Sequence, residues 1–312
     1  MDEKEKRRKS LLRRIKMNKQ VYFLLLPVVI WLIVYSYVPL YGIILAWKDY
    51  SPSKGIWGSP WVGWEHFEYM FSGPKFLEAF NNTIKISAIK LVVLFPMPLI
   101  LALLINEVRA TGYRRLVQTL TYMPHFVSWV ILGGLFKSFL SPETGALNQL
   151  LESIGLEKVA FMYEPNYFIP ILLFAETLKT TGWNSIIYLA SIMAIDSSMY
   201  EAAEIDGCGH FRRIWSITIP SIMPVVSVQL VLAIANIMNA GFGSIYNLYS
   251  PATESVAEII DTLAYKTFLN SGKWELSTAM GLFKTSINVV LMIIGNVLTK
   301  KMTGYSMYSF DN

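Results

Sequence analysis

The sequence predicts an all-α membrane protein with six transmembrane helices. Hydrophobic residues make up 54% of the 312 residues and charged residues only 16%, with a mean hydropathy of +0.42. In soluble domains about a quarter of the residues are charged, so this composition indicates a membrane protein. Apolar runs of about 20 residues, the length that crosses a hydrocarbon core of about 30 Å, recur along the chain. Lys and Arg gather in alternate connecting segments.

Six apolar segments are each expected to cross the membrane. The first contains no charged residue between Lys19 and Lys48, and the fourth is the least apolar because it contains Glu176 and Lys179. In chain order the predicted spans are Val21–Trp47, Asn82–Ile105, Leu116–Phe136, Tyr167–Ala190, Pro220–Phe242 and Met280–Thr299.

The distribution of Lys and Arg predicts that both termini lie in the cytoplasm. Residues 1–19 are dense in Lys and Arg, and the positive-inside rule places such flanks on the cytoplasmic side. With six spans, the loop with Arg114, the 191–219 loop and the C-terminal tail fall on the same side. The predicted organisation is a basic cytoplasmic segment 1–19, a transmembrane domain 20–302 with the cytoplasmic loop 191–219, and a cytoplasmic tail 303–312.

The composition of the chain argues against several functions. A single cysteine, Cys208, excludes an intrachain disulfide, and the three widely separated histidines show no metal-ligand spacing. No nucleophile elbow, phosphate-binding loop or dinucleotide fingerprint occurs. Lys and Arg flank apolar runs and form no basic face with stacking aromatics, which argues against nucleic-acid binding. We therefore expect no catalytic residue and no metal ligand.

The segments expected outside, about 48–81, 137–166 and 243–279, are rich in Trp, Tyr, Gly and Pro. Aromatics such as Trp57, Trp61 and Trp64 are expected to anchor helix ends at the membrane interface. The alternative is a docking surface for an external partner. An external helix is expected around 257–269.

The strongest candidate site lies in the 191–219 loop. Ser198 precedes Glu201 by three residues, which is the spacing of a capping box and predicts a helix that starts near Ser198. Ala202 and Ala203 allow close packing, and Gly207 is expected to end the helix at positive φ.

A second short helix is expected over 209–216. It would present Phe211 and Trp215 on one face, and Pro220 would begin the next membrane helix. The resulting helix–turn–helix is either a docking surface for a soluble partner or an amphipathic interfacial linker.

The same loop resembles the hallmark loop of permease subunits of ABC importers. The matching residues are Glu201-Ala202-Ala203, Asp206-Gly207 and Ile217-Thr218-Ile219-Pro220. Cys208 stands where the family commonly has Ala, and Ile219 where it often has Leu. The resemblance covers nearly the whole chain and looks closest to the carbohydrate branch that imports complex sugars and oligosaccharides. It is carried there by residues 41–50, 81–83, 104–108, 122–129, 182–190 and 261–262.

The resemblance implies a type I importer fold in a bacterial cytoplasmic membrane and no chemical step on this chain. The implied partners are a second homologous permease forming a heterodimer, two cytoplasmic ATPase subunits that bind ATP and Mg, an extracytoplasmic solute-binding protein, membrane lipid and an oligosaccharide substrate. No cofactor is expected on this chain. Residues 198–216 would form the coupling helix that receives the motion of the ATPase. Its expected contact residues are Glu201, Ala202, Ala203, Asp206, Gly207, Phe211, Trp215 and Pro220.

Polar residues inside the predicted spans are the candidates for the substrate path, because buried charges in membranes usually face an interior or a cavity. They are Glu176, Lys179, Asn184, Asn236, Asn239 and Asn288. Glu176 and Lys179 either pair with each other or line a cavity, and the asparagines either line the path or join helices by hydrogen bonds. Lys85 and Lys90 are expected near the outer end of the second helix, where Lys85 can snorkel.

Two other functions stay open at this point. A permease of the same architecture could carry another solute, such as an amino acid. A channel or membrane-embedded enzyme is the remaining class, but a channel needs no ATPase-docking loop and an enzyme should show clustered catalytic residues.

Overall fold

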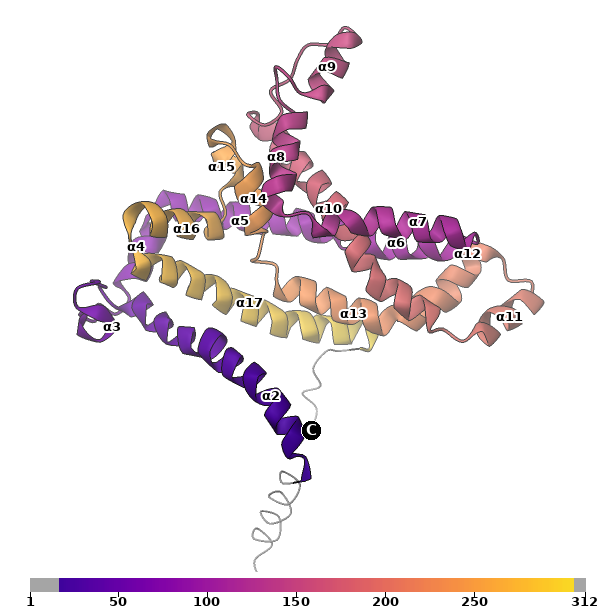
Figure 1. Ribbon diagram of the computed structural model, residues 1–312, viewed down its shortest axis with the longest axis horizontal. Coiled ribbons are helices and arrows are strands. Elements are labelled where there is room, and N and C mark those ends of the chain that lie inside the picture. The colour runs from indigo at the N-terminus through magenta and orange to yellow at the C-terminus, as the bar shows by residue number, and fades with distance from the viewer. Residues whose placement is uncertain (1–16, 306–312) are drawn as a thin grey trace, which may run out of the picture.

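The computed structural model describes residues 17–305, and within that range the chain is helical with no β-strand. Most of the predicted basic segment 1–19 and of the tail 303–312 lies outside the described residues. Figure 1 shows an elongated molecule, with α11 and α12 at one end of the long axis and α3, α4 and α16 at the other. The candidate loop therefore lies at the end opposite to α3, α4 and α16, which belong to segments expected on the other side of the membrane.

The first span leaves the rest of the chain along most of its length (Figure 1). It comprises α2 (Lys19–Leu32), the π-helical η1 (Ile33–Tyr37) and the 3-10 helix η2 (Val38–Trp47). None of its apolar window is buried, and only η2 packs on α17 (Trp274–Thr303). A helix that is apolar on all sides and unburied faces lipid or another chain.

Two helix pairs form most of the membrane core. The first pairs α6 (Pro96–Glu107), which continues α5 (Pro74–Leu94), with α10 (Pro165–Met193). The second pairs α13 (Ile219–Ala235) with α17. The helix of the second span begins at Pro74, eight residues before the predicted Asn82. Its first turns contain polar residues and so do not belong to the apolar run from which the span was predicted.

Two of the predicted spans are interrupted. The third, predicted as one helix over Leu116–Phe136, is α7 (Thr111–Tyr122) with η3 (Met123–Phe126), followed by α8 (Trp129–Phe139), with a bend of 101° between them. Pro124 lacks an N–H to continue the ladder, and Ser128 caps the new helix by accepting from the amide of Ile131.

The fifth span is also shorter than predicted, since its helix ends at Ala235 and not at Phe242. Residues 236–241 form a break before α14 (Phe242–Leu248), and Gly241 in that break has φ 102°, a conformation that favours glycine.

Four helices of the described chain are long and apolar enough to cross a membrane, or five if the bent pair is one span. They are Lys19–Trp47, Pro74–Glu107, His210–Ala235 and Trp274–Lys301. The 29-residue α10 is long enough but is not among them, in keeping with Glu176 and Lys179 within it. The predicted number of six therefore stays a prediction.

The remaining short helices lie in connecting segments. They are α3 (Gly55–Gly58), α4 (Glu65–Ser72), α9 (Ala146–Ser153), η5 (Pro251–Thr253), α15 (Glu254–Ala257) and α16 (Ile260–Ser271). The helix expected around 257–269 corresponds to α16.

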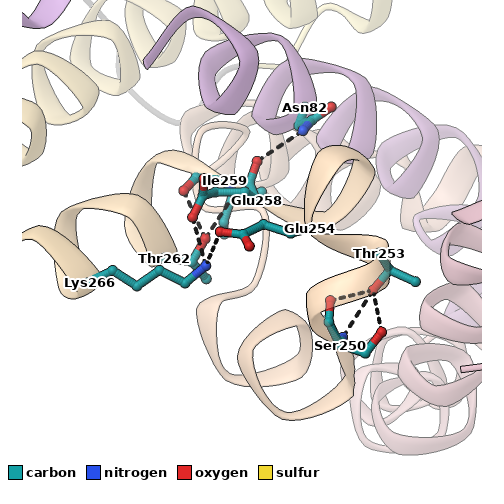
Figure 2. A network of polar contacts seen from close by, with 8 residues as sticks. All are labelled: Asn82, Ser250, Thr253, Glu254, Glu258, Ile259, Thr262 and Lys266. Carbon is teal, nitrogen blue, oxygen red and sulfur yellow. Dashed lines mark hydrogen bonds and ion pairs between the residues drawn. The ribbon is translucent and has the colours of Figure 1, made fainter. Parts of the chain in front are cut away.

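An ion-pair network fastens α16 to α15 and α5 (Figure 2). Lys266 Nζ lies 2.7 Å from Glu254 Oε1 and 2.8 Å from Glu258 Oε1. Asn82 of α5 donates to the carbonyl oxygens of Ser255 and Glu258, at 2.9 and 3.1 Å. The hydrogen bond from Lys266 lowers the pKa of Glu254 against the opposing effect of burial. Burial alone would lower the pKa of Lys266, but its bonds to the two glutamates outweigh burial and raise that pKa.

We expect Lys266→Met to lower the stability of the protein at neutral pH by about 1–2 kcal/mol, because two carboxylates lose a charged donor. The depressed pKa of Glu254 gives stability that is present above its unfolded value, about 4.3, and lost in acid. The raised pKa of Lys266 gives stability that is present below its unfolded value, about 10.4. The difference in Tm between wild type and variant, measured in detergent, should therefore be largest between about pH 5 and 10 and shrink at pH 3.

The matched control for this prediction is Lys158→Met, which removes the exposed Lys158–Glu152 pair. It should change Tm little, since exposed pairs contribute about 0–1 kcal/mol. Equal effects of the two variants at pH 7 would contradict a stabilising role for the Lys266 network.

Candidate functional site

The α11–α12 hairpin consists of α11 (Ser197–Ile205), the turn 206–209 and α12 (His210–Arg213). The first helix is capped by Asp196 and not by Ser198, so the predicted capping box is wrong. Asp196 Oδ1 accepts from the amide of Ser198 at 2.9 Å, and this bond lowers the pKa of Asp196. Because Asp196 has extended backbone and a charged acceptor, it takes the cap position two residues before the serine.

The turn after α11 is closed by backbone bonds around a glycine, as predicted. Gly207 has φ 70°, the amide of Cys208 donates to Ala203 O at 2.8 Å, and the amide of Gly207 donates to Glu204 O at 3.0 Å. This pair of bonds is the Schellman motif, in which the glycine adopts the left-handed conformation. The Gly207-Cys208 step therefore sets the angle between the two helices.

The second helix of the hairpin was expected to end near residue 216, but it does not end there. From α12 the chain continues through the π-helical η4 (Ile214–Thr218) into α13, so that one helix runs from His210 to Ala235. Pro220 lies in the first turn of α13, as predicted, but the helical chain that contains α13 already starts at His210. Since Pro220 has no N–H to bond the carbonyl of Ser216, the helix widens into a π turn at that place.

One polar contact joins the two helices of the hairpin, and two others tie the hairpin to η4 and α6. Tyr200 Oη and Thr218 Oγ1 are 2.9 Å apart, and Arg213 pairs with Glu204 at 3.2 Å. His210 Nε2 lies 3.1 Å from a carboxylate oxygen of Glu107, the last residue of α6. Both limbs of the hairpin are thereby fixed to each other and to α6.

The hairpin and the start of η4 expose large apolar side chains beside charged ones. Ile205, Phe211 and Trp215 are 87%, 78% and 70% exposed. Among the sequence-predicted coupling residues, Ala203 alone is half-buried. The other seven, Glu201, Ala202, Asp206, Gly207, Phe211, Trp215 and Pro220, are exposed. Such a surface, partly apolar and rigidly held, is suited to contact with another protein.

A cavity of about 870 Å³ lies between α5, α6, α10 and α13. Four of the six residues predicted for a substrate path line it: Glu176, Asn184, Asn236 and Asn239. Lys179 and Asn288 do not. The predictions also missed several polar or aromatic lining residues, among them Ser87, Lys90, Thr180, Trp183 and Gln229.

Glu176 and Lys179 do not pair with each other. Glu176 accepts from Lys90 Nζ at 2.7 Å and from Ser244 Oγ, whereas Lys179 donates to the carbonyl oxygens of His125 and Val127. The partners of each side chain come from other elements: Lys179 donates to carbonyl oxygens that an interrupted helix leaves free, and Glu176 accepts from donors of α5 and α14.

Lys90 was expected near the outer end of its helix, but it does not lie there. It lies sixteen residues after the first residue of α5, lines the cavity, and donates to Ala240 O at 2.6 Å as well as to Glu176. The signal that could have found it is that two lysines and one carboxylate occupy neighbouring spans.

The asparagines divide into two kinds. Asn236 and Asn239 are exposed to the cavity and bonded to each other at 3.0 Å, and Asn184 is exposed on the facing wall. Asn288 instead accepts from the amide of Met238 at 3.1 Å and so joins α17 to the break after α13. Within residues 17–305 no group of three or more His, Cys, Asp or Glu side chains is placed to hold a metal ion.

Comparison with known families decides what kind of protein carries these features. Residues 95–304 match the model of the family described as binding-protein-dependent transport system inner membrane component. The chain belongs to this family. It is therefore an ABC importer permease of the type I fold and carries no enzyme activity of its own.

Relatives along the whole chain agree with this assignment. The permease is 39% identical to protein LplB of Bacillus subtilis, over 94% of this chain and 92% of that protein. It is 40% identical to the polygalacturonan/rhamnogalacturonan transport system permease protein YteP of the same organism, over 98% and 95% of the two chains. A chain of a bacterial alginate ABC transporter, solved in complex with an alginate pentasaccharide-bound periplasmic protein, has a TM-score of 0.86 at 38% identity, covering 95% of this chain and 99% of its own.

Two substitutions test the turn of the hairpin in this permease. A Cβ has open space at both Gly207 and Gly209, but only Gly207 has positive φ, and Gly209 is the N-cap of α12. We expect Gly207→Ser to destabilise the turn by about 1 kcal/mol, because a side chain disfavours the left-handed conformation. Hydrogen exchange of the 197–213 segment, followed by mass spectrometry, should become about fivefold faster.

The same substitution at the second glycine is the control. Gly209→Ser should leave exchange unchanged or slower, since serine is a preferred N-cap residue. Equal acceleration in both variants would show that the left-handed backbone at Gly207 is not what holds the turn.

Proposed function

We propose that this permease is a membrane subunit of an ATP-driven importer of oligosaccharides derived from a complex polysaccharide, and that the α11–α12 hairpin is where an ATPase subunit docks. The observation that carries the proposal is the construction of the hairpin. It is capped, closed by a Schellman turn and tied to α6 and η4, yet its outer face leaves Phe211 and Trp215 uncovered. A rigid, partly apolar surface of this kind can receive a push from a partner and pass it on to the membrane helices.

The proposed topology has six spans, with α10 and the bent α7–α8 pair completing the four apolar helices. Glu176 and Lys179 account for the lower hydropathy of α10, and both have internal partners. Lys and Arg at residues 1–19, 109–115, 212–213 and 300–301 then all flank the cytoplasmic face. In this topology both termini and the hairpin are cytoplasmic.

The proposed partners follow from the family and from surfaces that this chain leaves open. The family description names a binding protein, which we place on the external side. The uncovered first span supports a second homologous permease, forming a heterodimer. Two cytoplasmic ATPase subunits would bind ATP and Mg and engage the hairpins of the two permeases.

Oligosaccharides are the proposed substrate because of the relatives and of the cavity wall. YteP is named for polygalacturonan and rhamnogalacturonan transport, and the similar solved chains come from an alginate transporter. Sugars are bound by hydrogen-bonding side chains and by aromatic faces, and this wall offers Asn184, Gln229, Asn236, Asn239 and Trp183. We assign Glu176 and these asparagines to the substrate path, and Lys179 and Asn288 to the support of its walls.

The proposal is tested by reconstitution. The permease, its partner permease and the ATPase are co-expressed and reconstituted into liposomes, and the binding protein is added outside. ATP is enclosed in the liposomes, where it reaches the transporters whose hairpin faces the lumen. ATP-dependent uptake of oligosaccharides released from pectic or alginate polymers should be observed, with no uptake of an amino acid. Uptake of an amino acid without uptake of any oligosaccharide would refute the substrate assignment.

Glu201→Lys tests the docking role of the hairpin. Glu201 is exposed and has no hydrogen bond or ion pair within the described chain, so its replacement leaves the permease fold intact. A reversed charge at the docking surface should lower ATP-dependent uptake at least tenfold, since a mismatched charge at an interface costs several kcal/mol. The variant should still reach the membrane in normal amount.

Glu143→Lys is the matched control, because Glu143 is also an exposed glutamate with no bonded partner among residues 17–305 but lies on the proposed external side. Its uptake should stay within twofold of wild type. Normal uptake by Glu201→Lys would contradict the docking role.

A further inference from the structure

Each of the two interrupted helices has its freed carbonyl groups bonded by a lysine from a neighbouring helix. At the break between η3 and α8, Lys179 of α10 donates to His125 O and Val127 O. At the break after α13, Lys90 of α5 donates to Ala240 O. Both lysines supply the hydrogen-bond donors that the backbone needs in lipid.

The two lysines differ in what else surrounds them. Lys179 does not line the cavity, and no carboxylate pairs with it within the described chain. Lys90 lines the cavity and forms an ion pair with Glu176, which also lines it. The side chains of Lys90 and Glu176 are 15% and 8% exposed. The Lys90 bonds are therefore on the cavity surface, where water or a polar solute can compete with them, whereas the Lys179 bonds are away from it.

The break at Lys90 is built closely around the ion pair. A Cβ on Gly241 would lie 2.8 Å from Lys90 Nζ and 2.9 Å from Glu176 Oε1, so that the charged groups touch the backbone of the break. Ser244 of α14 donates to the same carboxylate oxygen. The pair thus joins α5, α10 and the α13–α14 break at one point.

The pair also marks one end of the cavity. Along α10 the lining residues run from Glu176 to Ala190, and along α5 and α6 from Ser87 to Pro98. The residues of the break, Asn236 and Asn239, lie at the end shared by Glu176 and Lys90. In the proposed topology, α10 enters from outside, so this is the external end of the cavity.

We propose that the Lys90–Glu176 ion pair is a latch that holds the α13–α14 break in place and closes the external end of the cavity. This inference rests on the topology of the proposed function. Release of Ala240 O and Glu176 by Lys90 removes the tie between the break and α5, and leaves the bond from Ser244 to Glu176 as the remaining tie to α10 at this point. Lys179 keeps the other break fixed, so movement is confined to the side that carries the ion pair.

The latch is tested by the access of a membrane-impermeant maleimide to the cavity from outside intact cells that express the complete transporter. Cys208, the single native cysteine, is replaced by serine, and Ala190→Cys places a thiol at the far end of the cavity. Ala190 is fourteen residues after Glu176, about 21 Å along α10. A reagent from outside must therefore pass the latch to reach it.

Lys90→Met should raise the rate of labelling from outside at least tenfold, because the bond to Ala240 O of the break and the ion pair with Glu176 are both lost. Lys90→Arg should stay within twofold of the parent, since a guanidinium can still donate to the carboxylate and to the carbonyl. Lys85→Met removes an exposed lysine from the same helix and should have no effect. Glu176→Gln, which keeps the shape but removes the charge, should give an intermediate rate and decides the matter if Lys90→Met fails to fold.

Labelling at the parent rate in Lys90→Met and Glu176→Gln would overturn the latch, provided that inside-out vesicles show the thiol to be reactive. No substrate enters this assay, so its failure is distinct from a failure of oligosaccharide uptake, which is measured separately. Uptake with an unchanged labelling rate would refute the latch alone.

Discussion

The need to satisfy every backbone group within lipid determines much of this structure. An unbroken helix satisfies its own carbonyl and amide groups, but the breaks at 127–128 and 236–241 do not. A lysine can satisfy several free carbonyl groups at once, because its ammonium group carries three hydrogen-bond donors at the end of a long side chain. Lys179 uses two of them on carbonyl oxygens, and Lys90 divides its donors between a carbonyl and Glu176. Charged residues that look out of place in an apolar sequence are thus the condition for its broken helices.

One long helix connects the break at 236–241 to the α11–α12 hairpin. From His210 to Ala235 the chain is helical without interruption, a length of about 39 Å. Its first turn belongs to the α11–α12 hairpin, its second half includes Gln229 on the cavity wall, and its end meets the break that contains Gly241. A tilt imposed at Phe211 would therefore move the residues next to the ion pair, with the π turn at 214–218 and the helix around Pro224 available to absorb part of it. The Tyr200–Thr218 contact lies on that π turn, which limits its flexibility.

Local signals were sufficient for some of these features and not for others. Gly207 was predictable because the Schellman turn depends on one glycine and its neighbours, and the apolar runs found four helices that suit a membrane. The cap was misplaced because Asp196 and Ser198 are both acceptable caps, and only the backbone conformation chooses between them. The continuation of the helix through Pro220 could not be predicted, since proline most often marks a helix start and π turns are rare. The partners of Glu176 and Lys179 depend on residues 52–86 positions away, to which helical periodicity gives no access.

The charge balance of the cavity bears on how a substrate is recognised. The charged residues among its lining are Lys90 and Glu176, and they neutralise each other. The rest of the lining is uncharged, with amide, hydroxyl, aromatic and aliphatic side chains. On the proposed function, such a wall would distinguish saccharides by shape and hydroxyl pattern and not by charge. One similar solved chain comes from a transporter for an acidic polysaccharide. For a saccharide of that kind, a compensating cation must come either from the second permease or from Lys90 itself. In the latter case the carboxylate of the sugar would replace Glu176 on the ammonium group, and binding of an acidic substrate would act directly on the residue that holds the break closed.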